Sequence, residues 1–483
     1  MKKVILGQID WGSFRLPRYL YLVLILVIGT LVARMVVYSP SQLIIISVGI
    51  LIILICLMRT WTALLLLLYL APFYGFVRWT IGISPVQAMW KEAMVVLLTL
   101  GWAIHRFVFK KEKLASTPLN LPLSLFLGLA IIQLFRASNI LQGLLGLRML
   151  ATYIPIYFIV ANMTVSKKQI RSVIFILMII GVVTASYGLW QASVGLEGLR
   201  SRGLAQIGSN LATMGYLRIF STFAGPEYLG LFMVLMIILG VALWMSGLSR
   251  PRKRILLIAM AVMFAALVLT LVRLEWFMLG MGLVLLTTLV KKKKPFGLLL
   301  AGIIAALIIF PPYVQERATM TFGPMDVSFQ DRMTTYFGWN IPNLLNNPLG
   351  AGLGGTSGRF VYERITGQET SSALIGGGGT ESGYFNVALE MGIPGLILYL
   401  WLFIIIIRYG LRTFRTLSDP FLKYLAAGIT TFVILIFFCQ MFGPLMQTFP
   451  AGDLYFWFFV ALLLKLKQIE KEEDSVSALK LVT

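Results

Sequence analysis

The chain has 483 residues, of which 59% are hydrophobic and 12% charged, and its mean hydropathy is +0.88. A soluble domain needs roughly 25% charged residues to cover its surface, so this composition excludes a water-soluble fold. The net charge of +22 lies in short basic clusters between apolar runs, a pattern that orients membrane proteins and excludes a nucleic-acid footprint.

Apolar runs of about 17–25 residues recur along the chain, and each is long enough to cross ~30 Å of hydrocarbon as a helix. We therefore expect an all-α, polytopic helical membrane protein with about 14 transmembrane helices and one large outer loop. The predicted spans are 19–37, 41–58, 61–77, 87–105, 120–135, 144–162, 172–194, 225–246, 255–272, 275–290, 296–311, 382–407, 424–446 and 453–466. The N-terminus shows no small-residue cleavage site, so no removable signal peptide is expected.

Each basic cluster follows an even number of predicted spans, which places both termini in the cytoplasm. Residues 1–466 are expected to form a single transmembrane domain, and residues 467–483 a polar cytoplasmic tail that frays. Residues 195–224 and about 312–381 would then lie outside. A loop as long as the second is usually functional. Its segment FQDRMTTYFGWNIPNLL (329–345) predicts an amphipathic helix at the membrane surface.

The basic residues are distributed unevenly between the two sides. The predicted cytoplasmic set holds 17 Lys and 11 Arg, whereas the outer or intramembrane set holds 12 Arg and one Lys. Arginine binds phosphate oxygens through a planar two-pronged fork, and it stays charged when partly desolvated. This bias favours an outward cavity for a phosphate or diphosphate, although snorkelling and loop ion pairs account for some of these arginines.

Several kinds of chemistry lack their residues in this sequence. There is no GxxxxGK[ST] phosphate loop, and the single histidine, His105, cannot build a zinc site or a Ser–His–Asp triad. Cys56 and Cys439 fall in apolar spans and are expected to be packing residues. We expect neither a cofactor nor a metal. The segment NPLGAGLGGTSGRF (347–360) predicts a tight loop whose backbone approaches a ligand.

Four segments in order resemble one family of membrane enzymes: YLRIFSTFAGPEYLGLFMVL (216–235), LTLVRLEWFMLGMGLVLL (269–286), DRMTTYFGWNIPNLLNNPLGAGLGG (331–355) and TESGYFNVALEMGIPGLILYL (380–400). Together they resemble the O-antigen ligase and Wzy-type polymerase superfamily of C-type membrane glycosyltransferases. The resemblance covers roughly residues 200–446, and the first 190 residues match only in hydropathy and span count.

The resemblance implies a C-type glycosyltransferase fold, a donor carried on undecaprenyl diphosphate, and transfer without a metal. Arg218 matches the family's arginine before the mid-chain helix. Arg273 matches the arginine of an SRG-like helix end, but here Val272 and Leu274 replace the serine and glycine. Where ligases of the family carry a His-Asn pair, this chain has Glu381 and Ser382, which argues against ligase activity.

The expected reaction is an inverting transfer of a growing glycan onto a lipid-linked repeat unit at the outer leaflet of the bacterial inner membrane. Such polymers are of the O-antigen, exopolysaccharide or capsule type. Arg218 and Arg273 are expected to stabilise the leaving diphosphate. Glu381 would orient or deprotonate the acceptor hydroxyl, and Thr380 capping the following helix is the structural alternative. The other predicted substrate-binding residues are Arg332 from the loop, Arg136 or Arg148 as support, and Glu227. Stacking on sugar rings is expected of Tyr336, Trp339 and Tyr384, and an interfacial aromatic belt is the alternative for these three.

Two alternatives remain open at this stage. One is a ligase that attaches glycan to a lipid or protein acceptor, and the other is a flippase or transporter of lipid-linked oligosaccharides. Transporters often show paired halves with broken helices at matching places, and this sequence shows no such halves. The expected partners are the undecaprenyl-diphosphate-linked donor and acceptor and membrane lipids, and a chain-length regulator is a further candidate.

Overall fold

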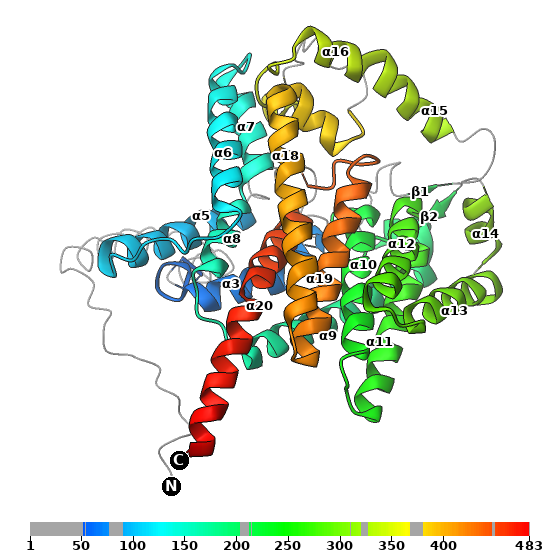
Figure 1. Ribbon diagram of the computed structural model, residues 1–483. Helices are drawn as coiled ribbons and strands as arrows, with labels where there is room; N and C mark the ends of the chain where they lie inside the picture. Colours follow the sequence, from blue (N-terminus) through cyan, green and yellow to red (C-terminus); the bar gives the residue numbers. More distant parts are fainter. Residues whose placement is uncertain are drawn as a thin grey trace, which may run out of the picture.

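The computed structural model describes residues 52–53, 55–76, 90–202, 212–213, 215–309, 311–319, 327–367, 380–446 and 450–482. Within these residues the fold is helical, as predicted, apart from one short antiparallel pair of two-residue strands. The strands β1 (Ala212–Thr213) and β2 (Tyr216–Leu217) pair Ala212 with Leu217. Figure 1 shows the long helices side by side, with shorter helices above them.

The first half of the described chain forms helices of unequal length. They are α3 (Thr60–Leu70), the 3₁₀ turn η1 (Ala71–Phe73), α5 (Trp90–Ala103), the π-helix η3 (Ile104–Phe109), α6 (Asn120–Phe135), α7 (Ile140–Ala151), α8 (Ile154–Ala161), α9 (Lys167–Ser201) and α10 (Pro226–Trp244). Helices α7 and α8 form one apolar unit bent by 40°. Pro155 in the first turn of α8 lacks an N–H, which explains why the helix is interrupted here.

The second half adds the remaining long helices and the short helices of the loop. They are α11 (Arg250–Leu269), α12 (Arg273–Val290), α13 (Lys294–Ile309), α14 (Pro312–Thr319), α15 (Val327–Met333), the π-helix η5 (Thr334–Asn340), α16 (Ile341–Asn346), α17 (Ser357–Thr366), α18 (Gly383–Thr416), α19 (Pro420–Cys439) and α20 (Pro450–Val482). Helices α15, η5 and α16 follow one another without a gap, so the predicted amphipathic segment is helical.

Six described helices are long and apolar enough to cross a membrane, and the bent α7–α8 pair raises this to seven. Helices α3 and α6 are apolar but shorter. Every predicted span from 61–77 onward overlaps a described helix. The predicted span 19–37 lies outside the described residues, and 41–58 lies there in part. The chain is thus a multi-pass membrane protein.

The core is built around α10, α19 and α20. Helix α10 is apolar on all sides and almost entirely buried, because α9, α11, α12, α19 and α20 pack around it. Helix α18 packs against α19 and α6. Cys56 and Cys439 are free and buried, as predicted for packing residues.

The C-terminal tail differs from the prediction that it frays. Helix α20 continues without a break to Val482, and Figure 1 shows it extending below the other helices. The Glu470 carboxylate accepts the backbone N–H groups of Ser418 (2.7 Å) and Asp419 (2.6 Å). Lys167 forms salt bridges with both Asp419 (2.6 Å) and Glu473 (3.2 Å). These polar contacts hold the first turns of the tail against α9 and α19.

Candidate functional site: an arginine-lined turn and a loop carboxylate

The segment 218–222 is fixed by buried polar contacts from neighbouring helices. Gln191 of α9 accepts the Ser221 N–H (2.7 Å) and donates to the Ser221 carbonyl (3.1 Å). The hydroxyl of Thr222 donates to the Pro72 carbonyl (2.8 Å). Buried hydrogen bonds of this kind are costly to break. Arg218 therefore projects from a segment that neighbouring helices hold in place.

Arg218 lies between a carboxylate and the backbone of a tight turn. Its Nη2 donates to Glu227 Oε1 at 2.7 Å, and its Nε donates to the Thr270 carbonyl at 3.4 Å. Glu227 stands in the first turn of α10 and is half exposed. The two predicted site residues Arg218 and Glu227 thus lie in direct contact. The guanidinium is preoriented by an acceptor that an incoming anion can displace.

Three arginines, Arg218, Arg273 and Arg317, meet at the turn 270–273. We call this turn and the three arginines the arginine turn. Leu271 adopts a left-handed conformation (φ 55°), and Arg273 begins α12 two residues later. Arg317 of α14 donates its Nε to the Leu271 carbonyl at 3.4 Å. Helix α14 is held there because Val314 packs against Leu271 in a small apolar cluster. Arg317 was not singled out from the sequence, since its partner lies 46 residues away.

A buried carboxyl group lies beside the arginine turn. Glu275 is 1% exposed, and its Oε2 has no hydrogen-bond partner among the described residues. Its side chain packs on the backbone of Gly230, where an added Cβ would lie 2.9 Å from Glu275 Cγ.

Glu381 pairs with an arginine of the loop. Arg332 Nε lies 3.0 Å from Glu381 Oε2, and the two side chains are 30% and 47% exposed. Tyr336, one turn after Arg332, donates its hydroxyl to the Glu381 carbonyl at 3.1 Å and also to the Met441 carbonyl. Burial raises the pKa of Tyr336 to about 12, so the hydroxyl remains a donor. Tyr336 thus holds the backbone of Glu381 in place. Its ring is buried and therefore has no exposed face for stacking on a sugar.

The start of α18 differs from the predicted cap. Ser382 occupies the N-cap position, while the Thr380 hydroxyl donates to the Ser382 carbonyl at 3.2 Å and contacts Asn386. Thr380 as the cap is therefore wrong. Glu381 itself is left-handed, with φ 51°. A non-glycine residue there costs of order 1 kcal/mol and persists where its surroundings fix it, often at functional sites. The preceding glycines 376–379 lie outside the described residues.

The segment 440–446 connects the arginine turn with Glu381. Gln440 accepts the Gly383 N–H (2.8 Å) and the Ser382 hydroxyl (3.2 Å) at its carbonyl. Farther along the segment, an added Cβ on Gly443 would lie 3.7 Å from Leu274, the neighbour of Arg273. One short segment therefore contacts both the helix start that carries Glu381 and the helix start that carries Arg273.

The glycine-rich loop 347–356 contacts helices closely. Ala351 donates its N–H to the Leu389 carbonyl (2.9 Å), and Gln142 donates to the Gly354 carbonyl (2.8 Å). Glu390, buried in α18, accepts the Thr356 N–H at 2.9 Å. The small residues let this backbone approach α6, α7 and α18, which is a structural use of the expected tight loop. Glu390 was missed because its partner is 34 residues away.

The other predicted contact residues lie in three different places. Arg136 donates to the Leu349 carbonyl at 3.1 Å, beside the glycine loop. Arg148 pairs with Glu92 at 2.7 Å between α7 and α5. Tyr384 donates its hydroxyl to the Phe437 carbonyl inside the bundle. Trp339 is 47% exposed on η5, part of the continuous helical segment α15–η5–α16, which we call the loop helix. Among the predicted aromatic residues, Trp339 has the most accessible ring.

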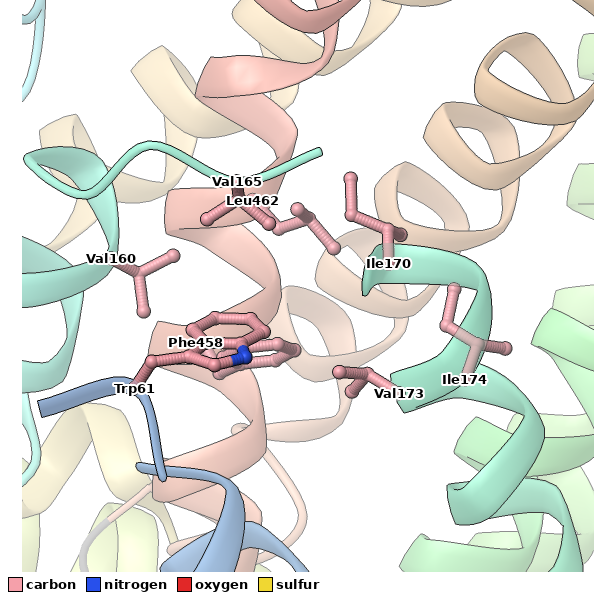
Figure 2. A pocket seen from close by; sticks show the side chains of 8 residues that line it. All are labelled: Trp61, Val160, Val165, Ile170, Val173, Ile174, Phe458 and Leu462. Atoms are coloured by element: carbon pink, nitrogen blue, oxygen red, sulfur yellow. The ribbon is translucent and has the colours of Figure 1, made fainter. Parts of the chain in front are cut away.

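One described pocket is entirely apolar. Figure 2 shows Trp61, Val160, Val165, Phe458 and Leu462 facing Ile170, Val173 and Ile174 across it. These side chains come from α3, α8, α9, α20 and the segment before α9. These side chains offer no group for acid–base chemistry. Within the part of the chain that the structure describes, no three His, Cys, Asp or Glu side chains lie close enough to hold a metal ion.

The arrangement of arginines at one helix start and a carboxylate at another accompanies a clear sequence relationship. Residues 258–400 match the family Wzy_C, O-antigen ligase. The matched region runs from α11 to α18. It includes the arginine turn except for Arg218, and also the loop helix and Glu381. No curated protein matches the chain. The chain thus carries an O-antigen ligase domain, from a family that transfers glycans in membranes as O-antigen ligases or polymerases.

Proposed function

We propose that the chain is a polymerase that transfers a growing glycan from undecaprenyl diphosphate onto a lipid-linked repeat unit. The convergence of Arg218, Arg273 and Arg317 on the turn 270–273, inside or beside the O-antigen ligase domain, is the observation that carries this proposal. Arginine forks on a partly buried turn are suited to a diphosphate whose charge increases as it leaves.

The proposed topology has about fourteen crossings, with both termini in the cytoplasm of a bacterial inner membrane. Residues 312–381 then lie outside, and the reaction takes place at the outer leaflet. The position of each basic cluster after an even number of predicted spans supports this orientation. The arginine turn and Glu381 lie at helix starts that this topology puts on the same outer side.

The proposed mechanism is an inverting displacement at the anomeric carbon of the donor glycan. The acceptor hydroxyl oxygen forms a bond to C1 as the bond from C1 to the diphosphate oxygen breaks. The hydroxyl proton passes to Glu381, and the electron pair leaves with the diphosphate. Arg218 would exchange its contact with Glu227 for the diphosphate, while Arg273 and Arg317 neutralise the developing charge. The step uses no metal.

The pair of Arg332 and Glu381 gives the loop a direct role in this step. Arg332 orients the Glu381 carboxylate through their 3.0 Å contact. Tyr336 fixes the backbone of Glu381 through its hydroxyl. Trp339, exposed on the same helix, is positioned to stack on a sugar ring. The loop helix would therefore contribute to both base positioning and glycan binding.

A ligase is the second candidate, because the matched family includes ligases. The family resemblance places a His-Asn pair in ligases where this chain has Glu381 and Ser382, and this favours polymerisation. A flippase is the alternative from another class. An enzyme still consumes its donor lipid in detergent. A flippase does not, because transport requires two compartments.

The test uses the purified protein in detergent with undecaprenyl-diphosphate-linked saccharides extracted from the cells that carry its gene. A polymerase releases undecaprenyl diphosphate and lengthens the remaining lipid-linked glycan. The reaction should continue in the presence of a metal chelator. Release of the lipid without a longer lipid-linked glycan points to a ligase lacking its acceptor. An unchanged donor contradicts glycosyl transfer and favours a flippase.

A further inference from the structure

An aromatic pair lies next to the arginine turn. The rings of Tyr216 in β2 and Tyr313 in α14 are stacked, with their centroids 4.1 Å apart and their planes 17° from parallel. Figure 1 shows β2 and α14 close to α12, whose first residue is Arg273. We call Tyr216 and Tyr313 the tyrosine pair. The mechanism proposed above uses neither residue.

Each tyrosine stands beside an arginine of the arginine turn. Tyr216 and Arg218 are exposed at least in part, whereas the residue that follows each of them is buried. This alternation is typical of an extended chain, in which residues i and i+2 point to the same side about 7 Å apart. On α14, Tyr313 and Arg317 are four residues apart and share one face of the helix. Two separate elements therefore each present one tyrosine and one arginine.

Tyr313 fixes the orientation of the Tyr216 ring. Tyr313 is itself held, because it packs against the small apolar cluster of Val268, Leu271 and Val314. Tyr216 is 45% exposed although one face of its ring lies on Tyr313. An exposed ring that is already held in place loses little freedom when a ligand binds. The tyrosine pair therefore offers a preformed, flat and apolar surface beside the arginine turn.

The sugar bonded to the donor diphosphate matches this surface in chemistry and in position. A pyranose ring carries C–H groups on its faces and hydroxyls at its edge. The C–H groups are slightly positive and are attracted to the negative face of an aromatic ring. A diphosphate bound to Arg218 brings its first sugar within one bond of the phosphate, and the Tyr216 side chain starts about 7 Å from that of Arg218. The ring of Tyr216 thus lies within reach of that sugar.

We propose that Tyr216, held by Tyr313, binds the sugar bonded to the donor diphosphate and so discriminates the donor from the undecaprenyl diphosphate left after transfer. Transfer breaks the bond between this sugar and the diphosphate, so the product keeps the phosphate contacts and loses the tyrosine contact. The tyrosine pair therefore favours replacement of the product by a new donor. This inference rests on the proposed function, in which the arginine turn holds the diphosphate.

The experiment compares the affinities of the purified protein in detergent for two lipids. The first probe is radiolabelled undecaprenyl-diphosphate-linked saccharide extracted from the source cells, and the second is undecaprenyl diphosphate. Binding is measured on ice, and chromatography of the bound lipid checks that the first probe stays intact. We define the preference as the Kd of the second probe divided by the Kd of the first. The parent protein should have a preference above one.

Variants of the tyrosine pair should change this preference through the first probe alone. Tyr216→Ala should lower it about fivefold, which is the size of one aromatic contact, and Tyr216→Leu should do the same while keeping apolar bulk. Tyr216→Phe and Tyr216→Trp should keep the preference, because they retain the ring. Tyr313→Ala should lower it, since Tyr216 is then no longer held.

Trp190→Ala is the matched control. Trp190 is 41% exposed and stacks on Tyr187 with centroids 5.3 Å apart, but both residues belong to α9. This variant should leave the preference unchanged. Melting temperatures check that all variants fold.

Four results would overturn the inference. They are a parent without preference, an unchanged preference in Tyr216→Ala and Tyr216→Leu, equal weakening of both probes by these variants, or an equal loss in Tyr216→Phe, which would assign the effect to the hydroxyl. Failure of the proposed function gives a different result. In that case Arg218→Lys binds both probes as the parent does, whereas a diphosphate site at the arginine turn requires that it weaken both equally.

Discussion

Replacing Glu381 by glutamine separates a catalytic carboxylate from a structural one. Glutamine keeps the shape and hydrogen-bonding capacity of glutamate but removes the charge, so it cannot take a proton from the acceptor. The ion pair with Arg332 is 3.0 Å long, and its side chains are 30% and 47% exposed. Exposed pairs of this kind contribute about 0–1 kcal/mol to stability. Glu381→Gln should therefore fold almost as well as the parent.

The effect on turnover should be much larger than the effect on stability. A general base is typically worth about 10²–10⁴ in rate, so Glu381→Gln should make little polymer while still binding the lipid-linked donor. Glu381→Asp should retain partial activity, because it keeps the charge with a shorter reach. The assay compares glycan chain length and undecaprenyl diphosphate release by the purified variants, alongside their melting temperatures.

Glu363→Gln provides the matched control. Glu363 forms a 2.7 Å pair with Arg359 on α17, in the same predicted loop, and has no assigned part in the reaction. Removing the Glu363 charge should change neither turnover nor glycan chain length by more than about twofold. Full activity of Glu381→Gln would refute the reasoning and leave Glu381 as a structural residue at the start of α18.

Three further predictions follow from particular contacts. Gly354→Ala should lower the melting temperature far more than Gly367→Ala. Both glycines have φ above 60°, but only at Gly354 would the new Cβ meet a backbone atom, at 2.1 Å. Equal losses of melting temperature would contradict the tight contact of the glycine loop. Burial is the largest single effect on Asp419 and opposes its ionisation, but the hydrogen bonds from Lys167 and from the Leu422 N–H, with the nearby positive charges, together lower its pKa. Asp419 therefore stabilises the fold above the ordinary aspartate pKa of about 4 and loses this contribution as the pH falls below it. Lys167→Met should flatten that part of the pH–stability profile, and an unchanged profile would contradict the assignment. A membrane-impermeant thiol reagent should label Thr334→Cys but not Ser418→Cys in intact cells, and labelling of the second alone would reverse the proposed topology.

The helical architecture could be predicted because each element is local in the sequence. An apolar run determines its own helix, and breaks occur where the chain supplies proline or glycine, as at Gly195 with φ 72° inside α9. The predicted span 172–194 ends at that glycine. The continuation of α20 to Val482 was not predicted, because Glu470 and Glu473 are held by partners on distant elements.

The candidate site could be predicted residue by residue but not as a set of contacts. Arg218 and Glu227 were both named as site residues, and the structure shows that they form an ion pair across nine residues of sequence. Arg332 and Glu381 were both singled out, but 49 residues separate them and nothing in the sequence indicates their ion pair. Arg136 and Arg148 were expected to support a diphosphate, and the structure shows them against Leu349 and Glu92. Partners this distant are fixed by helix packing, which a single sequence does not reveal.

The release of undecaprenyl diphosphate by purified lysine variants tests the central claim most directly. Arg218→Lys and Arg273→Lys keep the positive charge but lose the fork that binds two phosphate oxygens. Each should lower release by about 10²–10³, the usual loss when one transition-state donor is removed. Arg200→Lys, in an exposed pair with Glu197, should match the parent. Near-parent release by both Arg218→Lys and Arg273→Lys would contradict a diphosphate site at the arginine turn.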